Sequence, residues 1–460
     1  MLFVLLAAVY SFSVGLRATN ASSITGDEPF YLMTTVSLID DGDFDLTNQY
    51  ERRSFEAFFD HPNGLWMQSV ETNGRIVSPH EPGLSVLVVP GYLLDGLHGV
   101  QVQLMLVAAL TFSFAFVLTS LETHRVLLSW LVTAAVGLGA TAFVYSTEIY
   151  PEMPGALTLV LGLLLVRRSS RTVFDALALA VLLTMFLWLS MKYMPLGALL
   201  GVAFVYSAGW RERIVFTALC AISGAFYVWG HYALFDDLTA YSVNTVFEGA
   251  NTATVIEGHV SFQDRVYRIW GLLLDQRFGT ARWAPLLLLL PASLPLLLRG
   301  GSTGRLVLGL IVAQVLVATF IAITMMGWWF PGRTLITVVP LTALPLALLT
   351  AKLPIAGKVL AGGLGLTSIA FTVALRDAVT KEGVRLAVAP FDMQWAPFRW
   401  SRELFPNYQS WGMDTVIVTV VWLTAFVASM AAVTWWQYRD ELRSLRHRRP
   451  LPALFAMKQA

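Results

Sequence analysis

Long uninterrupted apolar runs dominate the chain, and short polar segments separate them. An apolar run of about 20 residues, with a range of about 17–25, is long enough for a helix to cross the hydrocarbon core of a bilayer. We therefore predict an all-α polytopic membrane protein with about twelve membrane-spanning helices (11–13). The expected spans are 2–19, 101–121, 126–147, 153–166, 173–191, 194–209, 214–235, 284–298, 306–326, 334–350, 354–375 and 414–436.

Two shorter patterns in the first long polar region predict helices that do not span. The apolar run 83–94 is too short to cross a bilayer, so we expect an interfacial or re-entrant segment there. Pro29 suits the first turn of a helix, and Leu32, Val36 and Ile39 then recur at helical spacing. This second pattern predicts a short amphipathic helix on the membrane surface.

Composition supports the membrane assignment. Charged residues make up only 13% of the 460 residues, about half of the usual ~25% in soluble proteins. Apolar residues make up 56%, and the mean hydropathy is +0.64, which excludes a disordered or an ordinary soluble chain. The net charge of +1 offers no basic surface for nucleic acid. Cys220 is the only cysteine, so neither an internal disulfide nor a cysteine-based zinc site is expected.

Basic residues predict the orientation. If the spans alternate from a cytoplasmic N-terminus, Lys and Arg concentrate in the short inside loops and in a basic cytoplasmic tail, 437–460. Both termini are then cytoplasmic, and a single transmembrane domain, 1–436, exposes three long external segments at about 20–100, 236–283 and 376–413. We expect the first helix to be retained, although the small residues at 18–22 leave a cleaved signal peptide open as an alternative.

The candidate chemistry lies on this external side, near the membrane. Asp27 and Glu28 form an adjacent carboxylate pair just after the first span, at the start of the predicted helix. The helix dipole favours anions there, so simple helix capping is one explanation and a functional site is the other. Further acidic, basic, histidine and aromatic residues recur on the same side, and ionisable groups at membrane depth tend to be functional. They occupy the segments 40–50, 78–84, 145–154, 192–193 and 327–333.

These segments resemble motifs of the membrane-embedded GT-C glycosyltransferases, especially the branch of protein O-mannosyltransferases and lipid A aminoarabinose transferases. The resemblance rests on Asp27-Glu28-Pro29, Asp40 to Tyr50, His80 to Gly83, Tyr150-Pro151-Glu152, Gly279 to Pro285 and Trp328 to Arg333. It extends over about 25–350, and the order of the motifs and their shared side make it more specific than any one of them. A large C-terminal periplasmic domain, which some members of the family carry, is not found in this chain.

The resemblance implies an enzyme of the plasma (inner) membrane that takes a sugar from a polyprenyl-phosphate carrier and passes it to an acceptor on the extracytoplasmic face. It implies Asp27 as general base, with Glu28 supporting it, because the acceptor must lose a proton. A cation must stabilise the departing phosphate, and the remaining candidates would bind substrate. These candidates are His80, Glu81, Glu148, Glu152, Lys192, Tyr193 and Arg333.

Several alternatives stay open at the level of the sequence. Capping or interfacial solvation also explains Glu148 and Glu152, and snorkelling at helix ends also explains Lys192 and Arg333. An oxygen-rich set of this kind would suit Mg²⁺ or Mn²⁺, although no spacing requires a metal. A transporter or lipid flippase, or a non-catalytic scaffold, would also fit a chain with many spans. The sugar and the acceptor, whether protein, lipid or glycan, are not indicated.

Overall fold

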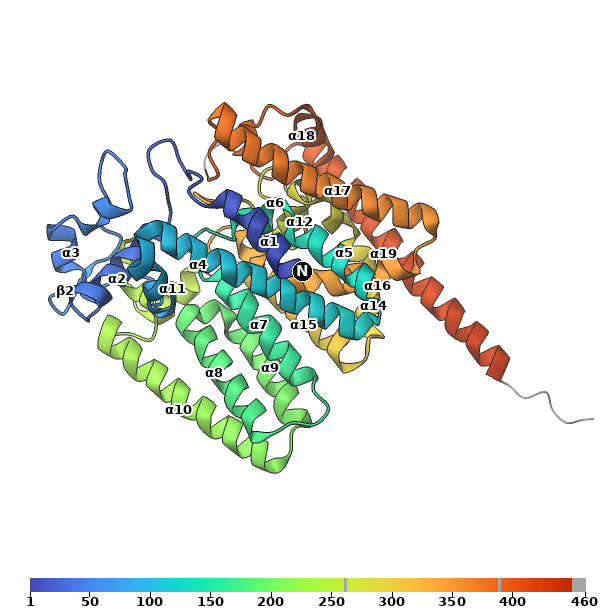
Figure 1. Ribbon diagram of the computed structural model, residues 1–460, viewed down its shortest axis with the longest axis horizontal. Coiled ribbons are helices and arrows are strands. Elements are labelled where there is room, and N and C mark those ends of the chain that lie inside the picture. The colour runs from blue at the N-terminus through green and yellow to red at the C-terminus, as the bar shows by residue number, and fades with distance from the viewer. Residues whose placement is uncertain (260–262, 388–389, 449–460) are drawn as a thin grey trace, which may run out of the picture.

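The computed structural model describes residues 1–259, 263–387 and 390–448. Within these ranges the chain is mostly helical, and its only strands form a hairpin of two two-residue strands, β1 (Glu71–Thr72) and β2 (Arg75–Ile76). The hairpin, α2 and α3 gather on one side of the molecule, and α19 extends away on the other (Figure 1). The expected all-α polytopic architecture is confirmed.

The helices follow the apolar runs of the sequence. They are α1 (Leu2–Tyr10), α2 (Glu28–Asp40), α3 (Thr47–Glu51), α4 (Gly83–Thr123), α5 (Val126–Gly137), α6 (Ala140–Val144), α7 (Glu152–Arg167), α8 (Val173–Leu189), α9 (Met194–Ser207), α10 (Trp210–Phe235), α11 (Thr252–His259), α12 (Arg268–Leu274), α13 (Thr280–Trp283), α14 (Leu290–Leu298), α15 (Gly301–Leu316), α16 (Ala343–Lys352), α17 (Ile355–Asp377), α18 (Ala396–Ser401) and α19 (Met413–Arg448). Residues 449–460 of the expected basic tail lie outside the described residues.

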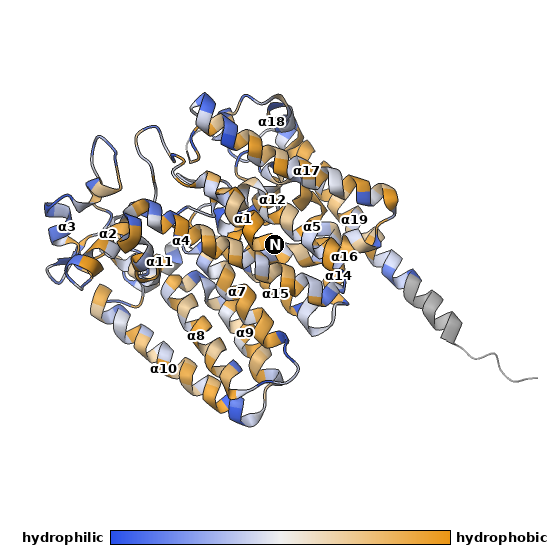
Figure 2. Cartoon of the chain, viewed as in Figure 1, coloured by the Kyte–Doolittle hydropathy of each residue, from blue (hydrophilic) through white to orange (hydrophobic). Residues whose placement is uncertain are grey.

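Six helical segments of the described chain are long and apolar enough to cross a membrane. They match the expected spans at 101–121, 214–235, 306–326, 334–350, 354–375 and 414–436. The other six expected spans fall on shorter or broken helices, such as α7, α8 and α9. Figure 2 shows hydrophobic residues along most of α10, which lies at the edge of the molecule beside α8.

Helix α4 contains a sharp bend that separates the short apolar run 83–94 from the expected span. Asp95 and Gly96 leave helical geometry, with Gly96 at φ 51° and ψ −133°. The two parts then touch, since the backbone N–H of Gly91 donates to Oε1 of Gln103 at 2.8 Å. The run is therefore a helix that turns back against the start of the next one, as a re-entrant segment does.

In two of the expected spans the helix ends before the apolar run does. The expected span 126–147 is broken between α5 and α6, because Gly139 is extended and packs against Ala284. The first expected span, 2–19, is helical only over Leu2–Ser13, because the chain becomes extended at Val14. In both cases the apolar run continues past the helix end, so hydropathy alone does not indicate the break.

Helix α2 exists as the Pro29 pattern predicted, but it does not lie on a surface with one exposed face. All ten residues Glu28–Ser37 are buried. The polar residues among them find internal partners: Oγ1 of Thr35, for example, donates to the carbonyls of Tyr31 and Ser85. The helix is thus an internal element that packs mainly against α4.

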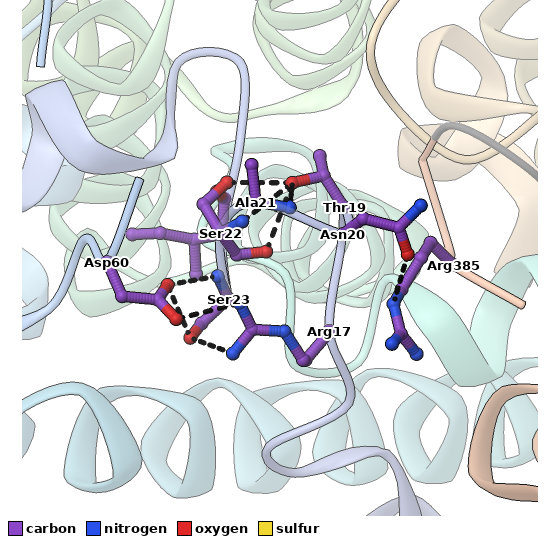
Figure 3. A network of polar contacts seen from close by, with 9 residues as sticks. Arg17, Thr19, Asn20, Ala21, Ser22, Ser23, Asp60 and Arg385 are labelled. Carbon is purple, nitrogen blue, oxygen red and sulfur yellow. Dashed lines mark hydrogen bonds and ion pairs between the residues drawn. The ribbon is translucent and has the colours of Figure 1, made fainter. Parts of the chain in front are cut away.

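The segment that leads from α1 to α2 forms polar contacts with two other parts of the chain (Figure 3). Arg17 forms an ion pair with Asp60, in which Nη2 and Oδ2 are 2.7 Å apart. The backbone N–H of Ser23 donates to the same carboxylate, and Nε of Arg385 donates to Oδ1 of Asn20 at 3.0 Å. These contacts hold the approach to Asp27 against two distant parts of the chain.

Candidate active site

Asp27 stands at the N-cap position of α2 but does not cap it. Its side chain makes no capping hydrogen bond. Instead, its Oδ2 lies 2.7 Å from Nη2 of Arg333. Plain helix capping therefore does not account for this carboxylate, whose side chain is 22% exposed.

Glu28 joins two loops. Its Oε2 accepts a hydrogen bond from the backbone N–H of Thr25 at 2.8 Å, and its Oε1 accepts one from the N–H of Ile149 at 2.9 Å. Both oxygens of this buried carboxyl group are thus engaged by backbone. Glu28 ties the segment before α2 to the segment before α7, next to Asp27.

Four charged residues from four distant segments form one continuous series of ion pairs. Arg333 reaches Asp27 with Nη2, and its Nε lies 3.0 Å from Oε1 of Glu152, the first residue of α7. The same oxygen lies 2.7 Å from Nζ of Lys192, which follows α8. We call Asp27, Arg333, Glu152 and Lys192 the charged cluster. The sequence motifs predicted all four, but not that they meet.

Aromatic rings and a glycine position Arg333. Its guanidinium carbon lies 3.8 Å from the ring centre of Tyr150 and 4.9 Å from that of Trp329, so the cation is held between two aromatic rings. Gly332 precedes it at φ 91°, a conformation that residues with a Cβ rarely adopt. A Cβ there would also lie 2.7 Å from the side chains of Thr141 and Thr280.

His80 lies at the edge of the charged cluster. Its Nε2 is 3.8 Å from Oδ1 of Asp27 and 3.1 Å from Oε1 of Gln68. The amide oxygen of Gln68 only accepts hydrogen bonds, so Nε2 of His80 carries a proton. The ring stacks on Tyr31 at 5.0 Å. Burial lowers the pKa of His80 more than the Asp27 carboxylate raises it, which favours the neutral imidazole.

Burial and the two cations divide the carboxyl groups into two kinds. Burial alone would raise the pKa of Asp27, but Arg333, His80 and Lys192 together lower it to about 2. For Glu148, burial and the neighbouring Glu28 raise the pKa above its usual value. Burial likewise raises the pKa of Glu28. Burial alone would also raise the pKa of Glu152, but Lys192 and Arg333 lower it. The site therefore holds two ionised carboxylates, Asp27 and Glu152, beside two carboxyl groups that retain protons more readily.

Some carboxyl oxygens at the site have no protein partner. Oε2 of Glu148 and Oε2 of Glu152 are buried and make no hydrogen bond within the described residues. Buried acceptors of this kind are normally satisfied by water or a ligand. Lys192 is the more exposed of the two cations, at 26%, against 10% for Arg333. An anion entering the cluster would therefore meet Lys192 first.

Besides His80 and Glu148, the expected binding residues Glu81 and Tyr193 also lie outside the charged cluster. Tyr193 is fully buried, and its ring lies 5.2 Å from Nζ of Lys192, so it supports that ammonium group from beneath. Glu81 points to α10, where it contacts Tyr227 and His231. The sequence did not single out Tyr31 or Gln68, because an aromatic residue in an apolar helix and a polar residue in a loop carry no distinctive signal.

The described residues contain no group of three or more His, Cys, Asp or Glu side chains arranged to hold a metal ion. Asp27 and Glu152, two of the expected oxygen ligands, are paired with Arg333 and Lys192 instead. We therefore derive no step that passes through a metal.

An apolar groove opens beside the site. Its volume is about 530 Å³, and Pro82 and Gly83, which follow His80 and Glu81 in the chain, lie in its wall. Helices α8 and α10 form most of the remaining wall. The lining residues are Phe44, Pro82, Gly83, Val86, Leu87, Thr184, Met185, Trp188, Leu189, Phe226, Trp229, Gly230, Ala233 and Leu234.

Comparison with known proteins identifies the fold. No protein-family model and no curated protein matches the chain. Two crystal structures of ArnT from Cupriavidus metallidurans are similar, one in the apo state and one bound to undecaprenyl phosphate. Their TM-scores are 0.52 and 0.51, and both are 13% identical to this chain. Each match covers 95% of this chain, and it covers 74% of the apo ArnT chain and 75% of the ligand-bound one. The resemblance to GT-C glycosyltransferases expected from the motifs is thus confirmed at the level of the fold.

Proposed function

We propose that this chain is a glycosyltransferase that moves a sugar from a polyprenyl-phosphate carrier to an acceptor on the extracytoplasmic face of the plasma (inner) membrane. The observation that carries the proposal is the charged cluster, in which two cations and two carboxylates meet beside an apolar groove. The ArnT fold supports it, as does the ArnT structure bound to undecaprenyl phosphate.

Lys192 and Arg333 would bind the phosphate of the donor. The ammonium group of Lys192 contacts Glu152 and has further N–H donors for a ligand. The guanidinium group of Arg333 is planar and offers pairs of N–H donors to phosphate oxygens. Charge-assisted hydrogen bonds from these groups stabilise the charge that develops on the departing phosphate. The apolar groove would hold the start of the isoprenoid chain.

Asp27 would act as general base once the donor phosphate is bound to the cations that surround it. A carboxylate with a pKa of about 2 is a weak base. A bound phosphate competes for Arg333 and Lys192, so the pKa of Asp27 rises when the donor is present. In the transfer step the bond between the anomeric carbon and the phosphate oxygen breaks, and the acceptor oxygen bonds to that carbon. The acceptor proton passes to Asp27, and polyprenyl phosphate leaves.

The test uses purified protein in liposomes with a panel of radiolabelled polyprenyl-phosphate sugars and a broad set of acceptors. Asp27→Asn keeps the size of the side chain but removes its charge and its basicity. We expect the wild type to consume one donor and Asp27→Asn to lose at least about a hundredfold of that rate, the usual scale of general-base catalysis. The matched control is Glu51→Gln, an exposed carboxylate of the same external segment.

Each outcome is informative. Equal consumption by the wild type and Asp27→Asn would remove Asp27 as the base and direct attention to Glu148. If the wild type consumes no donor, the glycosyltransferase proposal fails. Vectorial movement of a solute across the same liposomes would then favour a transporter.

A further inference from the structure

Glu81, Tyr227 and His231 form a buried polar group between α4 and α10, which we call the trio. Oε2 of Glu81 lies 2.7 Å from Nε2 of His231, and the hydroxyl of Tyr227 donates to Oε1 of Glu81 at 2.8 Å. Their exposed fractions are 9%, 5% and 0% for Glu81, Tyr227 and His231. The trio is separate from the charged cluster, and the proposed chemistry does not use it.

The geometry of His231 requires a shared proton. Its Nδ1 lies 2.9 Å from the carbonyl oxygen of Tyr227, which can only accept, so Nδ1 carries a proton. A neutral ring protonated there has a lone pair at Nε2, which faces a carboxyl oxygen of Glu81. One further proton, on Nε2 or on Glu81, must therefore lie in that contact. The contact is directional, unlike the apolar packing around it.

Apolar side chains of similar volume would fill this place without burying charge. Replacing a buried ion pair by apolar residues is often neutral or stabilising, whereas removing one partner alone costs about 3–5 kcal/mol. Stability alone therefore does not explain the trio. The directional contacts of Glu81 with Tyr227 and His231 fix the position of the segment that carries Glu81.

Trp188 connects the trio to the groove. Its ring centre lies 5.4 Å from that of Tyr227 and 5.5 Å from that of His231, and it also lines the groove. The neighbouring helices approach it closely. A Cβ on Gly83 would lie 2.3 Å from the carbonyl oxygen of Trp188, and one on Gly230 would lie 2.8 Å from its ring. Helices α4, α8 and α10 thus meet at this tryptophan.

The same junction borders two residues of the site. His80 directly precedes Glu81, and Lys192 lies four residues after Trp188, across the end of α8. A shift of Glu81 would move His80, and a shift of Trp188 would move Lys192. The trio therefore adjoins His80 along the chain, and Trp188 connects it to the groove and to the segment that carries Lys192.

We propose that Glu81, Tyr227 and His231 are positioning residues that align His80 and Lys192 with the phosphate of a lipid whose chain occupies the groove. The ligand class is an isoprenoid phosphate. The inference rests on the proposed function for this donor chemistry and deepens it. The trio does not touch the reacting atoms.

The test measures binding rather than turnover, with undecaprenyl phosphate, undecaprenol and geranyl phosphate as probes for the protein in nanodiscs. The ratio of affinities for undecaprenyl phosphate and undecaprenol reports phosphate recognition. The ratio for undecaprenyl and geranyl phosphates reports chain recognition. The variant Glu81→Met/Tyr227→Phe/His231→Leu replaces the trio by apolar residues. We expect it to keep the chain ratio and to lose about tenfold in the phosphate ratio, which is ~1.4 kcal/mol.

Two further variants complete the design. His231→Gln retains an N–H donor toward Glu81, so we expect it to preserve most of the phosphate ratio. Trp229→Ala opens the groove wall away from the trio and should lower the chain ratio while the phosphate ratio stays. If the triple variant does not fold, Tyr227→Phe takes its place, because it keeps the ring but removes the hydrogen bond to Glu81. We expect Tyr227→Phe to lower the phosphate ratio.

The outcomes separate the two proposals. A wild type that binds undecaprenyl phosphate no better than undecaprenol would contradict the proposed function itself. A wild type with a clear phosphate preference, together with a folded triple variant or a Tyr227→Phe variant that keeps the same phosphate ratio, would overturn only the role of the trio.

Discussion

Arg333 contacts two carboxylates and two aromatic rings with one guanidinium group. Its Nε and Nη2 reach Glu152 and Asp27, which come from opposite sides of the cluster. Tyr150 and Trp329 hold the planar group between them. A fork of fixed geometry is needed to make both contacts at once, so the residue type matters as much as the charge.

We therefore expect Arg333→Lys to behave as a severe change although it keeps the charge. A single ammonium group cannot bridge Asp27 and Glu152 in the same way, and it stacks less well on the rings. Binding of undecaprenyl phosphate in nanodiscs should weaken by at least about tenfold, or ~1.4 kcal/mol. Arg385→Lys is the matched control, since Arg385 donates to Asn20 in the network of Figure 3 and should leave this binding unchanged. Equal binding by both variants would argue against Arg333 as a phosphate ligand.

At the residue scale the sequence indicated much of the site. The motifs supplied Asp27, Glu152, Lys192 and Arg333, because charge at the edge of apolar runs is conspicuous. The motifs did not indicate which groups each of these side chains contacts. Glu28 was expected to support Asp27, but its sequence position did not indicate that backbone N–H groups bind both of its oxygens. A hydrogen bond to the backbone of a distant loop depends on tertiary structure, and no local pattern reports it.

At the scale of elements, breaks and bends position the site. The turn 327–333, the bend of α4 at Asp95 and Gly96, and the gap between α5 and α6 all interrupt apolar stretches. Hydropathy predicted where apolar helices occur, and it predicted that the run 83–94 stands apart from the following span. It could not predict the end of α1 or the break at Gly139, because neighbouring helices decide those positions.

The turn before Arg333 offers a test at this scale. Gly332→Ala would place a Cβ against Thr141 and Thr280 in a left-handed conformation. The conformation alone costs about 1–2 kcal/mol, and the clash adds to that and displaces Arg333. Gly383→Ala is the control, since Gly383 is also left-handed, at φ 73°, but has open space around its Cβ. We expect a similar or smaller loss of thermal stability in Gly383→Ala, and loss of undecaprenyl phosphate binding only in Gly332→Ala. Unchanged binding in Gly332→Ala would contradict this role for the turn.

For the molecule as a whole, the series of ion pairs joins segments that are far apart in the chain. Asp27 and Arg333 are separated by 306 residues, and Glu28 adds a second connection to the loop before α7. These contacts assemble the first external segment, the middle helices and the later turn into one unit. The sequence predicted that these motifs share one side of the membrane, but not which side chains pair, since pairing follows from the packing of all the helices.

Overall stability should depend on pH through Glu148. Burial and the neighbouring Glu28 raise its pKa in the folded state, so the folded protein binds a proton that the unfolded chain releases. Stability from this group is present below its unfolded pKa of about 4.3 and is lost as pH rises through the higher folded pKa. We expect Glu148→Gln to unfold at a higher temperature than the wild type at pH 8 and to show a smaller change between pH 5 and pH 8. Parallel pH profiles for the two proteins would refute this assignment.

The alternation of charge in the cluster has a consequence for turnover. Two anions and two cations leave no net charge among Asp27, Arg333, Glu152 and Lys192 while no ligand is bound. A polyprenyl-phosphate sugar is a diester with one negative charge, whereas the polyprenyl phosphate left after transfer is a monoester with up to two. The same cations therefore attract the spent carrier more strongly than the fresh donor. We therefore expect that, in the proposed reaction, polyprenyl phosphate inhibits the protein and its release limits the rate of turnover.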